Sequence, residues 1–390
     1  MSNIYAHSSS SRAARSPKRH KSWVVAIVLV AVAVAGVSVA AVVVHSNANR
    51  AAASPTSAPV THPADTGPLS IVSVSPADGT TGVPSDATIS VQFSVPLSPH
   101  SPAPTLTPPI AGSWQVVTPT SYAFVASAPL VPSSTETVSV PAGPAGVESA
   151  AGKKLDQPST VRFTVASGST LRLQQLLAQL GYLPVSFTPA GSLTAPQEAA
   201  QAQEGSFIWR WTEPASLESL WTVGTANEIT RGAVMAFESQ HEMKTDGAAG
   251  PALWEQLMAD ASAGTVNPSA YNYVYVSKAL PETTTVYSNG SPVYSTRANT
   301  GVAAAPTASG TFPVYLRYKV TTMSGTNPDG SKYSDPGIPW VSYFNGGDAL
   351  HGFVRGSYGY PQSDGCVEMP PANAAVVYPL TPIGTLVTVS

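Results

Sequence analysis

The sequence predicts a mainly β, multidomain protein with one apolar helix near its N-terminus and one helical segment in its middle. At 390 residues the chain is longer than a single typical domain. It contains 37 prolines and many small and β-branched residues, a composition that favours short strands and turns over long helices. Only 11% of the residues are charged and the net charge is -3, which excludes a basic surface for nucleic acid.

An uncharged apolar run, WVVAIVLVAVAVAGVSVAAVVV, covers residues 23–44. As a helix it is long enough to cross a bilayer, which takes about 20 apolar residues. The basic tail before it, residues 1–22, has five Lys and Arg residues and no acidic residue. The positive-inside rule then predicts a signal anchor in the cell membrane, with a cytoplasmic N-terminus and the rest of the chain outside. A cleaved signal peptide is the alternative, although its apolar region usually has only about 7 to 15 residues.

Residues 45–68 are mostly Ala, Ser, Thr and Pro and are predicted to be an extended linker. Residues 69–166 then contain short alternating runs, such as ATISVQFSVPL and STVRFTV, between Pro, Gly and Asp turns. This spacing is typical of an immunoglobulin-like sandwich, and the segment VSPADGTTGVPSDATISVQFSVPL resembles bacterial Ig-like modules. No nucleophile lies here, so we interpret the domain as a spacer.

The periodicity becomes helical within residues 170–260. A leucine stripe from Leu171 to Leu180 ends at Gly181, and a second helical run begins near Thr230 and is punctuated by Asp246-Gly247 and Gly250-Pro251. These helices resemble a small three-helix peptidoglycan-binding module, interrupted by an insertion at residues 185–229. We expect the insertion's tryptophans to be core residues rather than a platform for sugar rings: Trp209, Trp211 and Trp221.

Residues 270–390 again alternate as strands, and Asn289-Gly290 is a strong hairpin signal. This β-rich domain contains Cys366, the only cysteine of the chain. A lone cysteine forms no internal disulfide, and it is either a small buried apolar residue or a nucleophile. A nucleophilic cysteine needs a partner that takes its proton, usually a histidine. Of the seven histidines only His241 and His351 lie in the two later domains, and His351, followed by Gly352, is the better candidate.

The motif HGFVRGSYGYPQSDGCVEM, at residues 351–369, resembles the mark of the L,D-transpeptidases of peptidoglycan, the YkuD family. That mark is His-Gly, a loop of some fifteen residues, then Ser-His-Gly-Cys. The segment NTGVAAAPTASGTFPV, at residues 299–314, and the stretch IPWVSYFNGGDALHG before His351 resemble two further family segments. The resemblance covers about residues 271–390 and implies a β-rich catalytic domain.

The resemblance implies a role for each matching residue. Cys366 is the nucleophile, His351 its general base and acid, and the Gly352 carbonyl orients the imidazole. The backbone N–H groups of Gly365 and Cys366 are the expected oxyanion donors, and Ser363 matches the family serine. Four residues between or beside the two motifs are candidates for substrate binding: Arg355, Tyr358, Gln362 and Asp364. No metal or organic cofactor is implied.

Two positions depart from the family pattern. Asp364 replaces the histidine before Gly-Cys, and Glu368 replaces an arginine often found two residues after the cysteine. An ionised carboxylate near Cys366 disfavours its thiolate, so we expect Asp364 to raise the pKa of the thiol.

The resemblance implies a cysteine-dependent acyltransferase that forms 3→3 cross-links between stem peptides and releases D-alanine. Its partners are peptidoglycan stem peptides and glycan, with carbapenem-type drugs as inhibitors. Two alternatives remain open at the level of sequence. If water is the acceptor, the protein is an L,D-carboxypeptidase. If the site has lost its activity, the protein is a catalytically inactive wall-binding protein.

Overall fold

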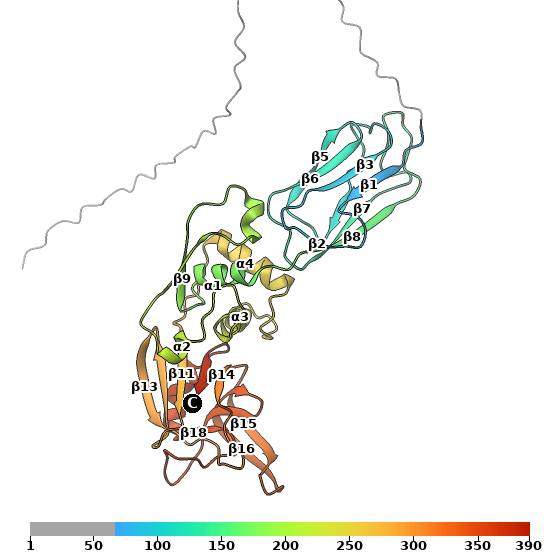
Figure 1. Ribbon diagram of the computed structural model, residues 1–390. Coiled ribbons are helices and arrows are strands. Elements are labelled where there is room, and N and C mark those ends of the chain that lie inside the picture. The colour runs from blue at the N-terminus through green and yellow to red at the C-terminus, as the bar shows by residue number, and fades with distance from the viewer. Residues whose placement is uncertain (1–66) are drawn as a thin grey trace, which may run out of the picture. The chain divides into compact units, whose positions relative to one another are not determined.

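A computed structural model describes residues 67–390 (Figure 1). The predicted basic tail, the apolar run and nearly all of the linker lie outside these residues. Within residues 67–390, no helix combines the length and apolarity needed to cross a membrane.

The N-terminal part of the described chain is a β-sandwich of two four-stranded sheets, as the alternating runs predict (Figure 1). Its core consists of inward-facing residues such as Val91, Phe93, Val138 and Phe163. One sheet has the order β1-β3-β6-β5 and the other β2-β8-β7-β4. The strands are β1 (Ile71–Ser75), β2 (Thr80–Val83), β3 (Ile89–Phe93), β4 (Thr105–Thr107), β5 (Gly112–Thr118), β6 (Ser121–Ala126), β7 (Thr135–Val140) and β8 (Ser159–Val165).

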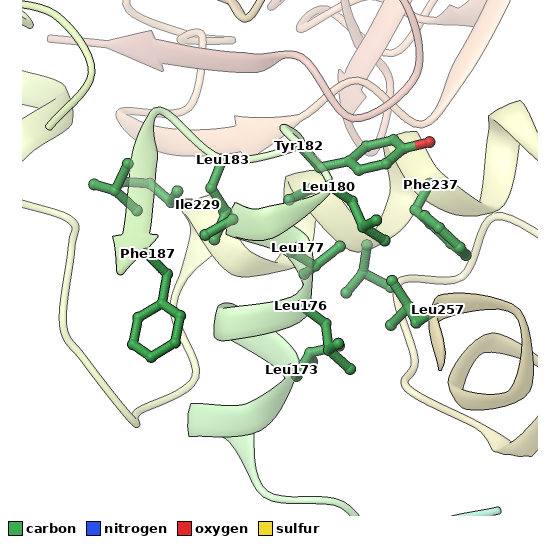
Figure 2. Close-up of a cluster of buried hydrophobic side chains, with 14 of the residues drawn as sticks. Leu173, Leu176, Leu177, Leu180, Tyr182, Leu183, Phe187, Ile229, Phe237 and Leu257 are labelled. Atoms are coloured by element: carbon green, nitrogen blue, oxygen red, sulfur yellow. The ribbon is translucent and has the colours of Figure 1, made fainter. Parts of the chain in front are cut away.

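The leucine stripe forms the centre of the helical region that follows. Ser169 caps helix α1 (Thr170–Gln179) by accepting a hydrogen bond from the Arg172 N–H, and Gly181, at φ +80°, ends it. Figure 2 shows Leu173, Leu176 and Leu177 of α1, and Leu180 directly after it, together with Phe237 and Leu257. These two come from α3 (Glu228–Gln240) and α4 (Pro251–Ala263), so the three predicted helices share one core.

The segment 185–229, predicted as an insertion, is folded and forms part of the same core. It contains strands β9 (Val185–Pro189) and β10 (Gly205–Trp209), which pair as an antiparallel hairpin, a 3-10 turn (Pro196–Ala200) and the short helix α2 (Ala215–Glu218). We call the shared core around Leu173, Leu176, Leu177 and Leu180 the leucine cluster. Trp209 and Trp221 pack against it and are partly buried, in agreement with a core role. Trp211 differs, because it lies under the Arg210 guanidinium, 4.3 Å from the ring centroid, and is not part of that cluster.

The C-terminal domain is built on two sheets (Figure 1). One has the order β13-β12-β11-β19-β14 and the other β15-β16-β17-β18. Asn289 and Gly290 have φ of 48° and 76°, as the predicted tight hairpin between β12 and β13 requires. The elements are β11 (Asn272–Ser277), β12 (Thr283–Ser288), β13 (Ser291–Arg297), β14 (Gly310–Pro313), β15 (Leu316–Thr326), β16 (Lys332–Asn345), β17 (Asp348–Gly352), β18 (Val367–Met369), α5 (Pro371–Val377), a 3-10 turn (Tyr378–Leu380) and β19 (Leu386–Val389).

The helical region and this domain share side chains in one core. Tyr273 of β11 and Leu386 of β19 belong to the leucine cluster, and the Tyr273 hydroxyl lies 2.8 Å from Ser216 Oγ. The backbones also come close, because a Cβ on Gly232 of α3 would lie 2.5 Å from the Gly384 carbonyl oxygen. Glycine is needed at Gly232 for that approach.

Candidate active site

The two halves of the sequence motif lie on adjacent strands. Strand β17 carries His351 and pairs in parallel with β18, which begins directly after Cys366. Leu350 stands opposite Val367, and His351 opposite Glu368. Leu350 and Val367 point into the domain's core, and because side chains alternate along a strand, His351, Cys366 and Glu368 share the other face. The long loop between His351 and Cys366 therefore brings the cysteine back beside the strand that carries the histidine.

That face forms one wall of a cavity of about 370 Å³. The opposite wall comes from the hairpin of β15 and β16, which Figure 1 shows extending from the domain. The cavity is lined by Met323, Asn327, Tyr333, Asp335, Ile338, His351, Phe353, Arg355, Gln362, Ser363, Asp364, Cys366 and Glu368.

His351 is held in one orientation. Its ring is buried, with 2% exposed, and Nδ1 lies 3.1 Å from the Gly352 carbonyl oxygen. An Nδ1–H that donates to this carbonyl leaves Nε2 free to accept a proton. Burial lowers the pKa of His351 below its usual 6.5, so the imidazole is neutral at neutral pH. Gly352 is packed closely as well, since a Cβ there would lie 2.9 Å from Pro371 Cα.

The thiol of Cys366 is held in its neutral form. The pKa of this thiol is raised to about 12, mainly by desolvation and to a smaller extent by the carboxylates of Asp348, Glu368 and Asp364, in that order. A hydrogen bond from the Ala349 backbone opposes the increase, and Sγ also lies 3.6 Å from the Gly347 carbonyl oxygen. A neutral thiol beside a neutral imidazole reacts when the base removes the proton during the attack.

Asp364 raises the pKa of the Cys366 thiol, as the sequence predicts, but it is not the main opposing charge. Its side chain is exposed, and it ranks behind Asp348 and Glu368 among the charges that raise the Cys366 pKa. Solvent screens an exposed charge. Asp348 was missed although it lies only three residues before His351, because sequence gives no measure of its burial. Ala308 N–H donates to Asp348 at 3.1 Å, and burial raises the pKa of this carboxyl.

Ser363 and Gly365 shape the turn before the cysteine. The buried Ser363 hydroxyl donates to the Cys366 carbonyl at 2.5 Å and accepts from the Gly365 N–H at 3.2 Å. This corrects the expectation for Gly365, whose N–H is already occupied within the turn. The Cys366 N–H makes no such bond within residues 67–390 and is the better oxyanion donor.

The other departure from the family pattern, Glu368, is paired. Its buried carboxylate receives two hydrogen bonds from Arg355, from Nε at 2.8 Å and from Nη2 at 2.7 Å. Arg355 Nη2 also donates to the Gln362 carbonyl at 3.3 Å. The positive charge near Cys366 is therefore the guanidinium of Arg355, which belongs to the loop between the two motifs.

The candidates for substrate binding separate into two groups. Arg355, Gln362 and Asp364 line the cavity, but Tyr358 does not. The Tyr358 hydroxyl donates to the Phe353 carbonyl at 2.5 Å and accepts from the Arg355 N–H at 3.0 Å, so it braces the loop. The sequence analysis missed Tyr333 and Asp335. The turn signal Asn327-Pro328-Asp329-Gly330 predicts the hairpin that carries them.

The upstream segment supports the cysteine loop. Asn299 exchanges backbone hydrogen bonds with Glu368, each 2.9 Å long, and Gly301 pairs with Ser363. Thr307 Oγ1 accepts from the Gly301 N–H at 2.8 Å. Within the described chain, no cluster of His, Cys, Asp and Glu side chains has the arrangement of a metal site.

Two stretches of the chain match known domain families. Residues 271–389 match the L,D-transpeptidase catalytic domain, and residues 65–165 match a bacterial Ig-like domain. No curated protein matches the chain.

Several solved structures are similar to this one. An L,D-transpeptidase from Mycobacterium smegmatis has 14% identity and a TM-score of 0.28, over 83% of this chain and 100% of that chain. L,D-transpeptidase 3 from Mycobacterium tuberculosis has 12% identity and a TM-score of 0.29, over 82% and 98%. The catalytic domain of an E. faecium L,D-transpeptidase has 25% identity and a TM-score of 0.29, over 30% and 96%. The family assignment rests on the domain matches: residues 271–389 of this chain form a catalytic domain of the L,D-transpeptidase (YkuD) family, which follows a bacterial Ig-like domain.

Proposed function

We propose that the chain is a peptidoglycan L,D-transpeptidase that forms 3→3 cross-links through an acyl-enzyme on Cys366. One observation carries the proposal: Cys366 and His351 share a face of strands β17 and β18 and line one cavity. The domain that contains them matches the L,D-transpeptidase catalytic family.

The first half-reaction is acylation. His351 Nε2 takes the thiol proton while Sγ forms a bond to the carbonyl carbon of the third stem residue. The C–N bond to the terminal D-alanine then breaks, and the leaving amine takes the proton from His351. The Cys366 N–H stabilises the oxyanion of the tetrahedral intermediate. The buried, neutral imidazole suits this role because it begins the reaction as a base.

The second half-reaction returns the free enzyme. The side-chain amine of a second stem peptide attacks the thioester, the C–S bond breaks, and the amine's proton passes through His351 to the sulfur. Water as acceptor would give the free tripeptide instead, which is L,D-carboxypeptidase activity.

The proposed setting is the outer side of the cell membrane. The apolar run at residues 23–44 serves as the anchor, and residues 45–68 as the tether. We also propose that the helical region binds peptidoglycan glycan. A cavity of about 720 Å³ with Phe187 and Phe207 in its lining supports this, because aromatic side chains pack well against sugar rings.

The test is incubation of the full chain with a disaccharide-tetrapeptide, followed by mass spectrometry. We expect an adduct on Cys366 that lacks the terminal D-alanine, no adduct in Cys366→Ala, and a cross-linked dimer when acceptor is present. Tripeptide without dimer would favour the carboxypeptidase. One of the similar solved structures is an L,D-transpeptidase in complex with imipenem. A carbapenem is therefore a suitable second probe of the Cys366 sulfur.

A non-catalytic wall-binding protein is the rival function. The thiol pKa of about 12 favours it, because burial and, to a smaller extent, three carboxylates oppose a thiolate at this position. Retention on peptidoglycan sacculi, without any adduct on Cys366 from either stem peptide or carbapenem, would support the rival and contradict the enzyme.

A further inference from the structure

Arg355 is the single Lys or Arg side chain among the described residues that line the cavity beside Cys366. The other charged lining residues are the carboxylates Asp335, Asp364 and Glu368. Any anionic group of a substrate that enters this cavity therefore has one cationic partner available.

The guanidinium of Arg355 is fixed along one edge and free at another. Glu368 and the Gln362 carbonyl occupy Nε and Nη2, and the Phe353 ring lies 4.6 Å from the guanidinium carbon. Nη1 makes no hydrogen bond with any residue the structure describes. The Arg355 side chain is 31% exposed, whereas its partner Glu368 is 5% exposed. A positioned donor with an unused N–H edge is suited to bind a carboxylate.

The distance from the nucleophile also fits. Cys366 and Glu368 are two residues apart on an extended segment, which corresponds to about 6.5 Å, and Arg355 is bonded to Glu368. In a stem peptide the terminal carboxylate is one residue beyond the attacked carbonyl, a span of about 3.8 Å between backbone carbons. A donor peptide attacked by Cys366 can therefore place its last carboxylate at the guanidinium.

We propose that Arg355 binds the terminal carboxylate of the leaving D-amino acid and so selects stem peptides that end one residue after the attacked bond. This inference rests on the proposed function and assigns the recognition of the acyl donor to one residue. Glu368 is a positioning residue, because it acts through Arg355 by holding the guanidinium in place.

The experiment compares two donors that differ only at this carboxylate. The full chain is given a tetrapeptide with a free C-terminus or the same peptide as its C-terminal amide. The kcat/KM for acylation is followed by mass spectrometry of the Cys366 adduct, which is identical for both donors. We expect the free acid to react about 10 to 100 times faster, the range for a charge-assisted hydrogen bond.

The key variant is Arg355→Gln with Glu368→Gln, which removes both charges together and leaves neither buried alone. We expect its preference for the free acid to fall to about one, because the cation that distinguishes the acid from the amide is absent. Arg355→Lys keeps a cation and should restore part of the preference. Lys319→Gln, an exposed cation of β15 outside the cavity, should keep all of it.

Three results would overturn the inference. These are equal acylation rates for both donors in the parent chain, the full preference retained in the double variant, and an equal loss of rate on both donors in the double variant, which indicates a structural role. The first result is obtained with the parent chain alone, so it does not depend on whether a variant folds. If neither donor acylates the parent chain, the proposed function fails as well, so the two failures are distinguishable.

Discussion

Asp348 lies so close to Gly365 that a Cβ at Gly365 would be 2.6 Å from Asp348 Oδ1. The backbone of Gly365 has φ +120°, which side chains rarely tolerate. The residue before the cysteine is therefore glycine for two separate reasons, the backbone angle and the neighbouring carboxylate.

Replacement of this glycine should disturb the nucleophile. We expect Gly365→Ala to reduce the rate of Cys366 acylation at least 10-fold and to destabilise the domain by about 1 to 3 kcal/mol, through strain and contact with Asp348. Mass spectrometry of the adduct and urea unfolding measure the two effects. Gly356→Ala is the matched control, since its Cβ meets nothing within 4 Å. Equal behaviour of the two variants would contradict the explanation.

The acidity of Cys366 should depend more on Asp348 than on Asp364. Removal of a nearby negative charge favours the thiolate, so both Asp348→Asn and Asp364→Asn should lower the thiol pKa from about 12. We expect the larger decrease for Asp348→Asn because that carboxylate is more buried. The measurement is the rate of iodoacetamide alkylation against pH. A larger shift in Asp364→Asn would show that the exposed carboxylate dominates after all.

The pH profile of acylation should reflect a base with a lowered pKa. Because burial favours neutral His351, the active form persists as pH falls until the lowered pKa is reached. We expect kcat/KM for acylation to be half-maximal below pH 6.5, with no loss between pH 7 and 9. A midpoint above 6.5 would mean that Glu368 stabilises the imidazolium more than burial opposes it.

The Arg355–Glu368 pair should contribute to stability when it is broken from one side. Arg355→Met leaves the Glu368 carboxylate, 5% exposed, without its partner and should cost about 3 kcal/mol of unfolding free energy. The double variant Arg355→Met with Glu368→Leu should recover most of this, since no charge is then left buried. Urea unfolding followed by tryptophan fluorescence tests both. A double variant as unstable as the single one would be the contrary result.

Local signals in the sequence were sufficient for much of the fold. The leucine spacing of α1, the Gly250-Pro251 start of α4 and the Asn289-Gly290 hairpin each depend on residues close in sequence, and each is present. Strands β9 and β10 were not predicted. They are short and separated by a long connection, so neither shows a clear periodicity by itself.

Candidate site residues that belong to a sequence motif could be predicted. The roles of residues that depend on contacts in the folded chain could not. His351 and Cys366 were identified from their spacing. The ion pair of Arg355 and Glu368 joins residues thirteen positions apart, and its burial follows from tertiary packing alone. The same reason explains why Asp348 was missed and why Tyr358 was placed at the substrate rather than within its own loop.

The shared core of Tyr273, Leu386 and the leucine cluster limits how this protein can be divided. A fragment cut at residue 271 would keep Cys366 and His351 but would expose the side chains of β11 and β19 that the helices cover. We therefore expect an expression vector for the catalytic sheet to give a well-folded protein only when it also encodes residues 170–263.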